Sequence, residues 1–222
     1  GGRRLSFYMA RFCGNDEIDV ELLLDREPRD TMVICTPWRK NEKAFYYNQK
    51  ILGMRAQGAF RWGAKLHEFD VGDSFGLLDW GRGVWTYDNV WYWAAVQGRI
   101  DGHVVALNLG YGFGDTSAAS ENMVFVDGVA HKLDEVDMGI PVDEYGDYDY
   151  LATWNVTDNE GRLSLVFEPQ IDRVDYINMG GIVTSDQHQV FGVLRGSVIL
   201  DDGSVLTIPG IRGACEHIHN RY

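Results

Sequence analysis

The sequence predicts an all-β fold, either a barrel or two packed β units, with little helix. Aromatic residues make up 13% of the 222 residues and 26 residues are glycine, which is typical of strands joined by tight turns. Roughly a dozen short apolar runs are separated by Gly- and Asp-rich turns, a spacing that favours a sandwich or barrel. No segment shows an amphipathic helix pattern over three turns.

The amino-terminal third predicts a hairpin and then further strands. Leu5–Phe12 and Glu17–Leu24 form the hairpin around a turn at 13–16, and 25–30 is a loop. Thr31–Trp38 is a short buried strand, and Pro37 marks its end because proline has no amide donor. The polar, mixed run Arg39–Lys50 predicts a loop with a turn of helix.

The central stretch Phe75–Leu109 follows a strand at 56–69 and a turn at 70–73, and it holds four of the seven tryptophans. Gly58 and Gly63 inside the 56–69 strand predict a bulge or a close backbone approach. Period-two alternation then places Trp91 and Trp93 on one face of a strand and Tyr92 on the other.

Loops and hairpins fill the remainder. The glycines of 110–120 do not form a phosphate-binding loop, because no lysine follows them, so this segment is a surface loop. Asp127-Gly128 predicts a hairpin over 123–133. The other expected elements are an acidic exposed loop at 134–150, a strand at 162–169, a hairpin of 189–200 with 204–210, and a terminal strand at 212–222.

Composition and charge limit the classes of partner that the protein is expected to bind. The net charge of −13 argues against binding nucleic acid, and no apolar run is long enough to span a membrane. Cys13, Cys35 and Cys215 cannot all pair with one another, and we expect reduced, buried thiols in a cytoplasmic protein. No motif predicts a cofactor.

A set of short motifs resembles the family called domain of unknown function 2804. The motifs are Leu78–Trp85, Trp91–Ala94, Leu107–Gly110, Glu121-Asn122 and Val126–Gly128, with Pro37-Trp38, Gln49-Lys50, Glu216-His217 and Arg221 fitting the same pattern, and Tyr222 where an aromatic residue is expected. The resemblance covers 31–222. Because family members are generally longer at the amino end, it implies that residues 1–222 are one all-β region at the carboxyl end of a longer protein.

The same resemblance implies a lipocalin-like fold. The family is similar to lipocalin-like β proteins that include carotenoid hydratases and isoprenoid or polyketide cyclases. This similarity implies a cavity for an apolar ligand, but it supplies no reaction, because function belongs to sites rather than to folds.

Asp79 and Arg82 are three residues apart around a glycine and predict a charge-assisted pair. In the functional interpretation, Asp79 is a proton donor or ligand anchor beside a cavity. In the structural interpretation, the pair only stabilises a turn. Trp80, Trp85, Trp91 and Trp93 likewise either line a pocket, where their faces would stabilise a cation, or fill the core.

The carboxyl end holds a third cluster. His217 and His219 share a strand face and could bind a metal with a distant third ligand, although no local spacing supplies one. Glu216 or His217 could instead perform acid–base chemistry. Glu121 could place a further carboxylate at a pocket rim, and a pair of acids would suit glycoside hydrolysis. In each case the alternative is an ordinary structural residue.

The leading hypothesis is an aromatic-lined cavity that binds a hydrophobic small molecule. Asp79, Glu121, Glu216 and His217 are the candidate catalytic groups, and Arg82 with the four tryptophans are the candidate ligand contacts. An enzymatic version would use one carboxyl as a general acid for hydration or cyclisation. The alternatives are a lipid or isoprenoid carrier without chemistry, and a carbohydrate-binding or carbohydrate-active protein.

Overall fold

The computed structural model describes residues 2–222, and all helical or strand structure in that range is β-strand. The strands are β1 (Gly2–Cys13), β2 (Asp16–Asp25), β3 (Met32–Trp38), β4 (Asn41–Trp62), β5 (Lys65–Phe69), β6 (Phe75–Val84), β7 (Asp88–Ile100), β8 (His103–Tyr111), β9 (Met123–Val126), β10 (Val129–Lys132), β11 (Val136–Asp137), β12 (Trp154–Asp158), β13 (Leu163–Met179), β14 (Val183–Ile199) and β15 (Val205–Arg221). They form two antiparallel sheets, so the predicted all-β fold of two β units is confirmed.

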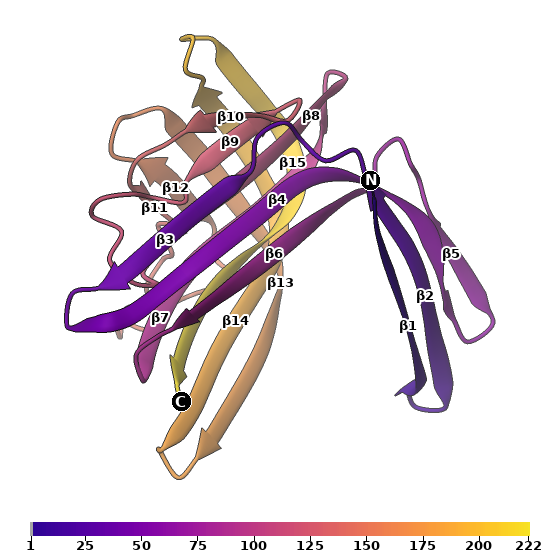
Figure 1. The fold of residues 1–222 in the computed structure, drawn as a ribbon, viewed down its shortest axis with the longest axis horizontal. Coiled ribbons are helices and arrows are strands. Elements are labelled where there is room, and N and C mark those ends of the chain that lie inside the picture. The colour runs from indigo at the N-terminus through magenta and orange to yellow at the C-terminus, as the bar shows by residue number, and fades with distance from the viewer. Residues whose placement is uncertain (1) are drawn as a thin grey trace.

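The larger sheet has nine strands in the order β10-β9-β8-β7-β15-β14-β13-β12-β11 and curls into a half-barrel (Figure 1). We call it the curled sheet. Its concave face encloses the main hydrophobic core, where the largest fully buried side chains include Trp154, Phe167 and Leu107. Apolar residues alternate along its strands because only one face points into this core.

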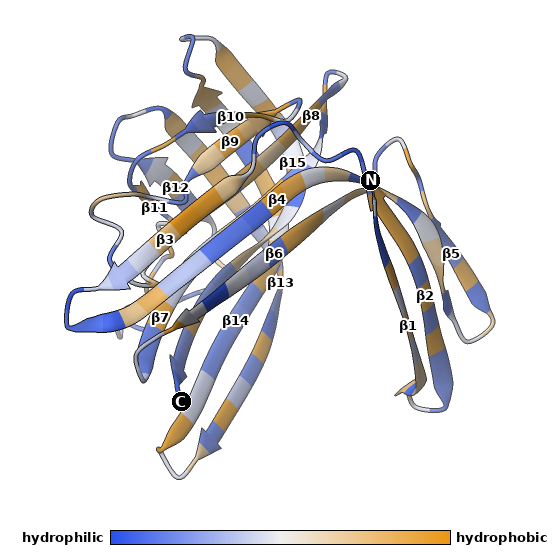
Figure 2. Ribbon diagram, viewed as in Figure 1, coloured by the Kyte–Doolittle hydropathy of each residue, from blue (hydrophilic) through white to orange (hydrophobic). Residues whose placement is uncertain are grey.

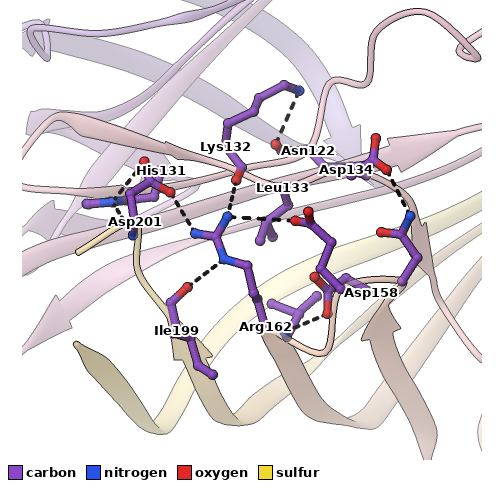
Figure 3. Close-up of polar contacts among 12 residues, drawn as sticks. Asn122, His131, Lys132, Leu133, Asp134, Asp158, Arg162, Ile199 and Asp201 are labelled. Carbon is purple, nitrogen blue, oxygen red and sulfur yellow. Dashed lines mark hydrogen bonds and ion pairs between the residues drawn. The ribbon is translucent and has the colours of Figure 1, made fainter. Parts of the chain in front are cut away.

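Arg162 links strands that lie at or near the two opposite edges of the curled sheet (Figure 3). Its guanidinium donates to the Lys132 carbonyl at 2.8 Å, to the Ile199 carbonyl at 3.1 Å and to the Asp201 carboxylate at 2.6 Å. Lys132 ends β10 at one edge of the sheet, whereas Arg162 directly precedes β13 near the other. The planar, five-donor group of arginine suits such a multidentate contact.

The smaller sheet has six strands and is built on β4, which pairs with β3 and β6 along its first half and with β2 and β5 along its second. The predicted loop with helix at 39–50 is wrong, because β4 begins at Asn41 and continues to Trp62. The alternation was hidden by polar residues on both faces of the strand, visible as the hydrophilic middle of β4 in Figure 2.

Other local predictions hold with adjusted boundaries. The strand expected at 56–69 is divided at Gly63 into the end of β4 and β5. At Gly58 a Cβ would lie 2.1 Å from the Glu21 carbonyl oxygen, so the predicted close backbone approach is present. Pro37 pairs within β3, which tolerates proline because β3 is an edge strand.

The two sheets share a small second core. Met32 and Ile34 from β3 and Leu52 from β4 pack against Ala106 and Phe125 on the convex face of the curled sheet. Beyond this contact, β1, β2, β5 and the end of β4 project away from the curled sheet (Figure 1). The convex face of β7, β8 and β15 and the facing part of β3, β4 and β6 therefore bound the space between the sheets.

The three cysteines differ in exposure. All three cysteines are free, but only Cys215 is buried, whereas Cys13 and Cys35 are exposed. Within the described chain, no helix is long and apolar enough to cross a membrane.

Candidate functional site

A cavity of about 360 Å³ lies between the two sheets. It is lined by five aromatic side chains from the strands and loops of both sheets, by three carboxylates and by one lysine, with the terminal tyrosine beside them: Tyr46, Trp85, Trp91, Trp93, Phe113, Asp79, Glu121, Glu216, Lys50 and Tyr222. The structure thus brings together three predicted catalytic carboxylates and three predicted tryptophans. Their roles stay a prediction.

The curled sheet supplies one wall through β7 and its neighbour β15. Trp91 and Trp93 line the cavity together, as period-two alternation predicts, whereas Tyr92 points to the other face and packs in the half-barrel core. Antiparallel register places Glu216 of β15 directly opposite Trp93. Glu216 therefore shares the convex face with the two indoles.

The six-stranded sheet supplies the opposite wall from alternate residues of β4. Tyr46 and Lys50 line the cavity, and Asn48 lies buried between them on the same face. Register places Lys50 opposite Asp79 of β6. Gly81 follows two residues later on the face of Asp79, where a Cβ would lie 2.5 Å from the Tyr46 ring. Glycine here leaves room for that ring.

Lys50 is the cation at the centre of the site, and its side chain is only 7% exposed. Its ammonium lies 2.9 Å from Glu121 Oε2, 3.7 Å from Asp79 Oδ2 and 4.1 Å from the centroid of the Trp93 ring. The other Asp79 oxygen accepts a 2.7 Å hydrogen bond from Asn48. One ammonium therefore partners two of the three carboxylates.

Asn108 of β8 fixes two neighbouring groups, the Trp93 indole and the Glu121 carboxylate. Its side-chain oxygen accepts from Trp93 Nε1 at 2.8 Å, and its amide donates to Glu121 Oε2 at 3.0 Å. Asn108 is fully buried, so these bonds satisfy polar groups that water does not reach. The indole plane and the Glu121 carboxylate are thereby held by one amide.

Glu216 is the carboxylate without a cation. It is 9% exposed and accepts a 2.6 Å hydrogen bond from the Gln189 amide through Oε1. Across residues 2–222, no lysine, arginine or histidine nitrogen lies within 4.0 Å of its carboxylate. Glu216 thus presents to the cavity a carboxylate whose hydrogen-bond partner among residues 2–222 is the Gln189 amide.

Phe113 organises the aromatic rings at one end of the cavity. It comes from the loop after β8, and its ring centroid lies 4.9 Å from Tyr46, 5.4 Å from Trp91 and 6.0 Å from Trp85. Burial and the nearby charges of Asp79 and Glu121 raise the pKa of the Tyr46 phenol well above its usual range. Tyr46 is therefore a neutral hydroxyl at physiological pH.

Two predicted ligand contacts do not reach the cavity. Asp79 and Arg82 are three residues apart on the same strand, so they point to opposite faces of β6, and the predicted pair between them is replaced by the Asp79–Lys50 pair. Trp80 also points away from Asp79 and packs on Tyr47 with ring centroids 5.9 Å apart. The turn of the structural interpretation is absent, because this segment is the extended strand β6.

His217 and His219 lie on the face of β15 opposite Glu216. The Tyr150 hydroxyl lies 2.7 Å from His217 Nδ1, and the Tyr92 ring stacks on the imidazole at 4.3 Å between centroids. His219 Nε2 lies 2.7 Å from Asp88 Oδ1. No group of three or more His, Cys, Asp or Glu residues suited to a metal occurs within residues 2–222.

Sequence reasoning overlooked Lys50, Asn48, Tyr46 and Phe113 as site residues. A signal was present in the alternation Tyr46-x-Asn48-x-Lys50, which places three polar side chains on one strand face. That pattern was masked because the intervening Tyr47 and Gln49 are also polar. Asn122, next to Glu121, has a structural role instead, with its side-chain oxygen accepting from the Gly110 amide at 2.7 Å.

The comparisons with known proteins agree with the motif resemblance. No curated protein matches this chain at a significant level. A family model does match, and it extends over residues 1–222, further toward the amino end than the motif resemblance. The chain belongs to the family described as domain of unknown function DUF2804.

Proposed function

We propose that the cavity between the sheets binds a small organic molecule with an apolar body. The observation that carries this proposal is the convergence of Trp85, Trp91, Trp93 and Phe113 on one cavity with a few charged groups. Small-molecule pockets generally combine apolar and aromatic walls with a few polar groups that fix orientation, in volumes of about 300–1,000 Å³. The cavity volume of about 360 Å³ suits a compact ligand.

Intrinsic fluorescence provides a direct test, because three of the seven tryptophans line the cavity. The purified protein is titrated with farnesol, oleate and cellobiose as isoprenoid, fatty acyl and carbohydrate probes. We expect farnesol or oleate to change the emission with saturation. Trp91→Ala should weaken that binding at least about tenfold, since burying an aromatic ring contributes more than 1.4 kcal/mol.

Trp80→Ala is the matched control, because Trp80 lies on β6 next to the cavity residue Asp79 but does not line the cavity. It should bind the probes as the wild type does. Binding that is insensitive to Trp91→Ala, or no saturable response to any probe, would refute the proposal. Saturation by cellobiose alone would replace the apolar ligand by a carbohydrate.

Proton transfer by Glu216 is a second candidate function, favoured because this carboxyl has no cation partner among residues 2–222 and accepts only from the Gln189 amide. As a general acid, Glu216 would donate its proton to an alkene carbon of the ligand. Water would then add to the resulting cation and return a proton to the carboxylate, giving net hydration. The aromatic faces would stabilise the intermediate cation.

This second candidate is tested by product analysis. Incubation with geraniol, followed by mass spectrometry, should reveal a product heavier by one water. Glu216→Gln should abolish the product and keep geraniol binding. A carrier protein would bind geraniol and release it unchanged from both proteins, which would leave only the binding role.

A further inference from the structure

The charges of the cavity do not balance. Asp79, Glu121 and Glu216 contribute three carboxylates, and Lys50 contributes one ammonium. That ammonium lies against Glu121 at 2.9 Å and near Asp79 at 3.7 Å, so its charge is already shared. Glu216 is left with an amide donor alone, although it is nine-tenths buried.

We propose that the ligand of this cavity carries a permanent positive charge of the ammonium type, which binds the Glu216 carboxylate. This inference rests on the proposed binding function and specifies the chemical class of the ligand. It is an alternative to general-acid chemistry by Glu216, which needs the protonated carboxyl. A ligand cation would give Glu216 the ionic partner that residues 2–222 do not supply, and pairing offsets part of the cost of burying a charge.

The aromatic walls fit the same ligand. Electron-rich ring faces attract cations within about 6 Å, and cages of such rings are a common means of binding alkylammonium groups. The cavity already contains one such contact, because the Lys50 ammonium lies 4.1 Å above the Trp93 ring. Trp85, Trp91 and Phe113 offer further rings on the same cavity.

Other charged ligands fit less well. An anionic ligand would be repelled, because the three carboxylates of the cavity outnumber its single ammonium. A metal ion would need several oxygen or nitrogen ligands close around it, and within residues 2–222 the carboxylates of the cavity form no such group. An alkylammonium group needs no such coordination, and its methyl groups can contact rings while its charge faces the carboxylate.

Choline and 3,3-dimethyl-1-butanol are the matched probes, because they have the same shape and differ in one positive charge. Each is titrated into the protein by fluorescence and calorimetry. We expect choline to bind at least about tenfold more tightly than its neutral analogue. Glu216→Gln should lower choline affinity at least about tenfold, leave the neutral analogue unchanged, and so remove the preference.

Glu216→Gln preserves size and keeps an oxygen to accept from Gln189, so it tests charge rather than packing. Glu68→Gln on the exposed strand β5 removes the same charge outside the cavity and should leave both affinities unchanged. Equal effects of the two variants on choline would show that net charge alone attracts the cation and would overturn the inference.

The remaining outcomes separate this inference from the proposed function. Equal binding of choline and its neutral analogue, with both weakened by Trp91→Ala, would overturn the cationic ligand and keep the cavity as a binding site. Farnesol binding without choline binding would likewise overturn the cationic ligand and keep the cavity as a binding site. A lack of saturable binding by every probe would overturn both.

Discussion

The position of Glu121 depends on the absence of a side chain at Gly110. A Cβ on Gly110 would lie 2.5 Å from Glu121 Oε1 and 2.7 Å from its Cδ. The carboxylate that partners Lys50 thus occupies space that only glycine on β8 leaves open. The close contact connects a backbone position of the curled sheet to the charge network between the sheets.

Gly110→Ala should therefore displace the Glu121 carboxylate and weaken its contact with Lys50. We expect the free energy of unfolding to fall by about 1–3 kcal/mol, as for other overpacked sites, measured by urea denaturation. Glu121→Ala in the same background removes the clashing atoms, so the two substitutions should be clearly non-additive. Additive effects would show that the methyl group is accommodated without moving Glu121.

Lys50→Met should be among the most damaging substitutions in the site. It leaves Glu121 and Asp79 without their shared cation, and breaking a buried ion pair from one side costs about 3–5 kcal/mol. Chemical denaturation at neutral pH measures the loss. Lys43→Met, on the exposed start of β4, should change stability by less than about 0.5 kcal/mol. Similar stability of the two variants would mean that the Lys50 network contributes little.

Arg162→Lys should loosen the connection between the ends of the curled sheet. A lysine ammonium cannot reproduce the fork that contacts Lys132, Ile199 and Asp201. The lost hydrogen bonds should lower the free energy of unfolding by about 1–2 kcal/mol. Hydrogen exchange should increase first at β10 and at the start of β13, and uniform exchange across the sheet would argue against this role.

His217 should make stability depend on pH. Burial, with a smaller effect of His188, lowers the pKa of His217 to about 4 from its usual 6.5. As the pH falls below 6.5 the unfolded chain binds this proton first, so stability is retained above pH 6.5 and lost progressively toward pH 4. The shift would correspond to about 3 kcal/mol, and solvent around the half-exposed ring should reduce it to about 1–2 kcal/mol.

His217→Phe provides the comparison for that pH dependence. Phenylalanine keeps a ring beside Tyr92 but loses the hydrogen bond to Tyr150, which should cost about 1 kcal/mol at neutral pH. Urea midpoints measured from pH 7.5 to pH 4.5 should fall less steeply for the variant. Parallel curves for the two proteins would show that His217 does not contribute to acid sensitivity.

Much of the fold follows from local sequence signals. The turn at Asp127-Gly128, the first hairpin and the alternation of Trp91 and Trp93 depend on neighbours in the chain and on period two, and all of them are present. The family motifs also pointed to Asp79, Glu121 and Glu216, which line one cavity. Roles for these residues remain proposals.

The incorrect predictions have a common physical origin. A polar strand that lines a charged cavity looks like a loop, which is why Lys50 was missed. The pairing of Asp79 with Lys50 rather than Arg82 depends on the register between β4 and β6, and no local pattern encodes that register. Phe113 belongs to a glycine-rich loop, and its contacts arise only when distant rings are brought together.

Successive residues of β15 point to opposite faces of the curled sheet. Glu216 faces the cavity, and His217 faces the half-barrel interior. Inserting or deleting one residue before Glu216 would exchange these directions, placing an acid beside Tyr92 and Tyr150 and an imidazole among the indoles. A change of length in β15 would therefore disturb both of its faces at once, whereas the exposed turn at Tyr145 lies outside this register.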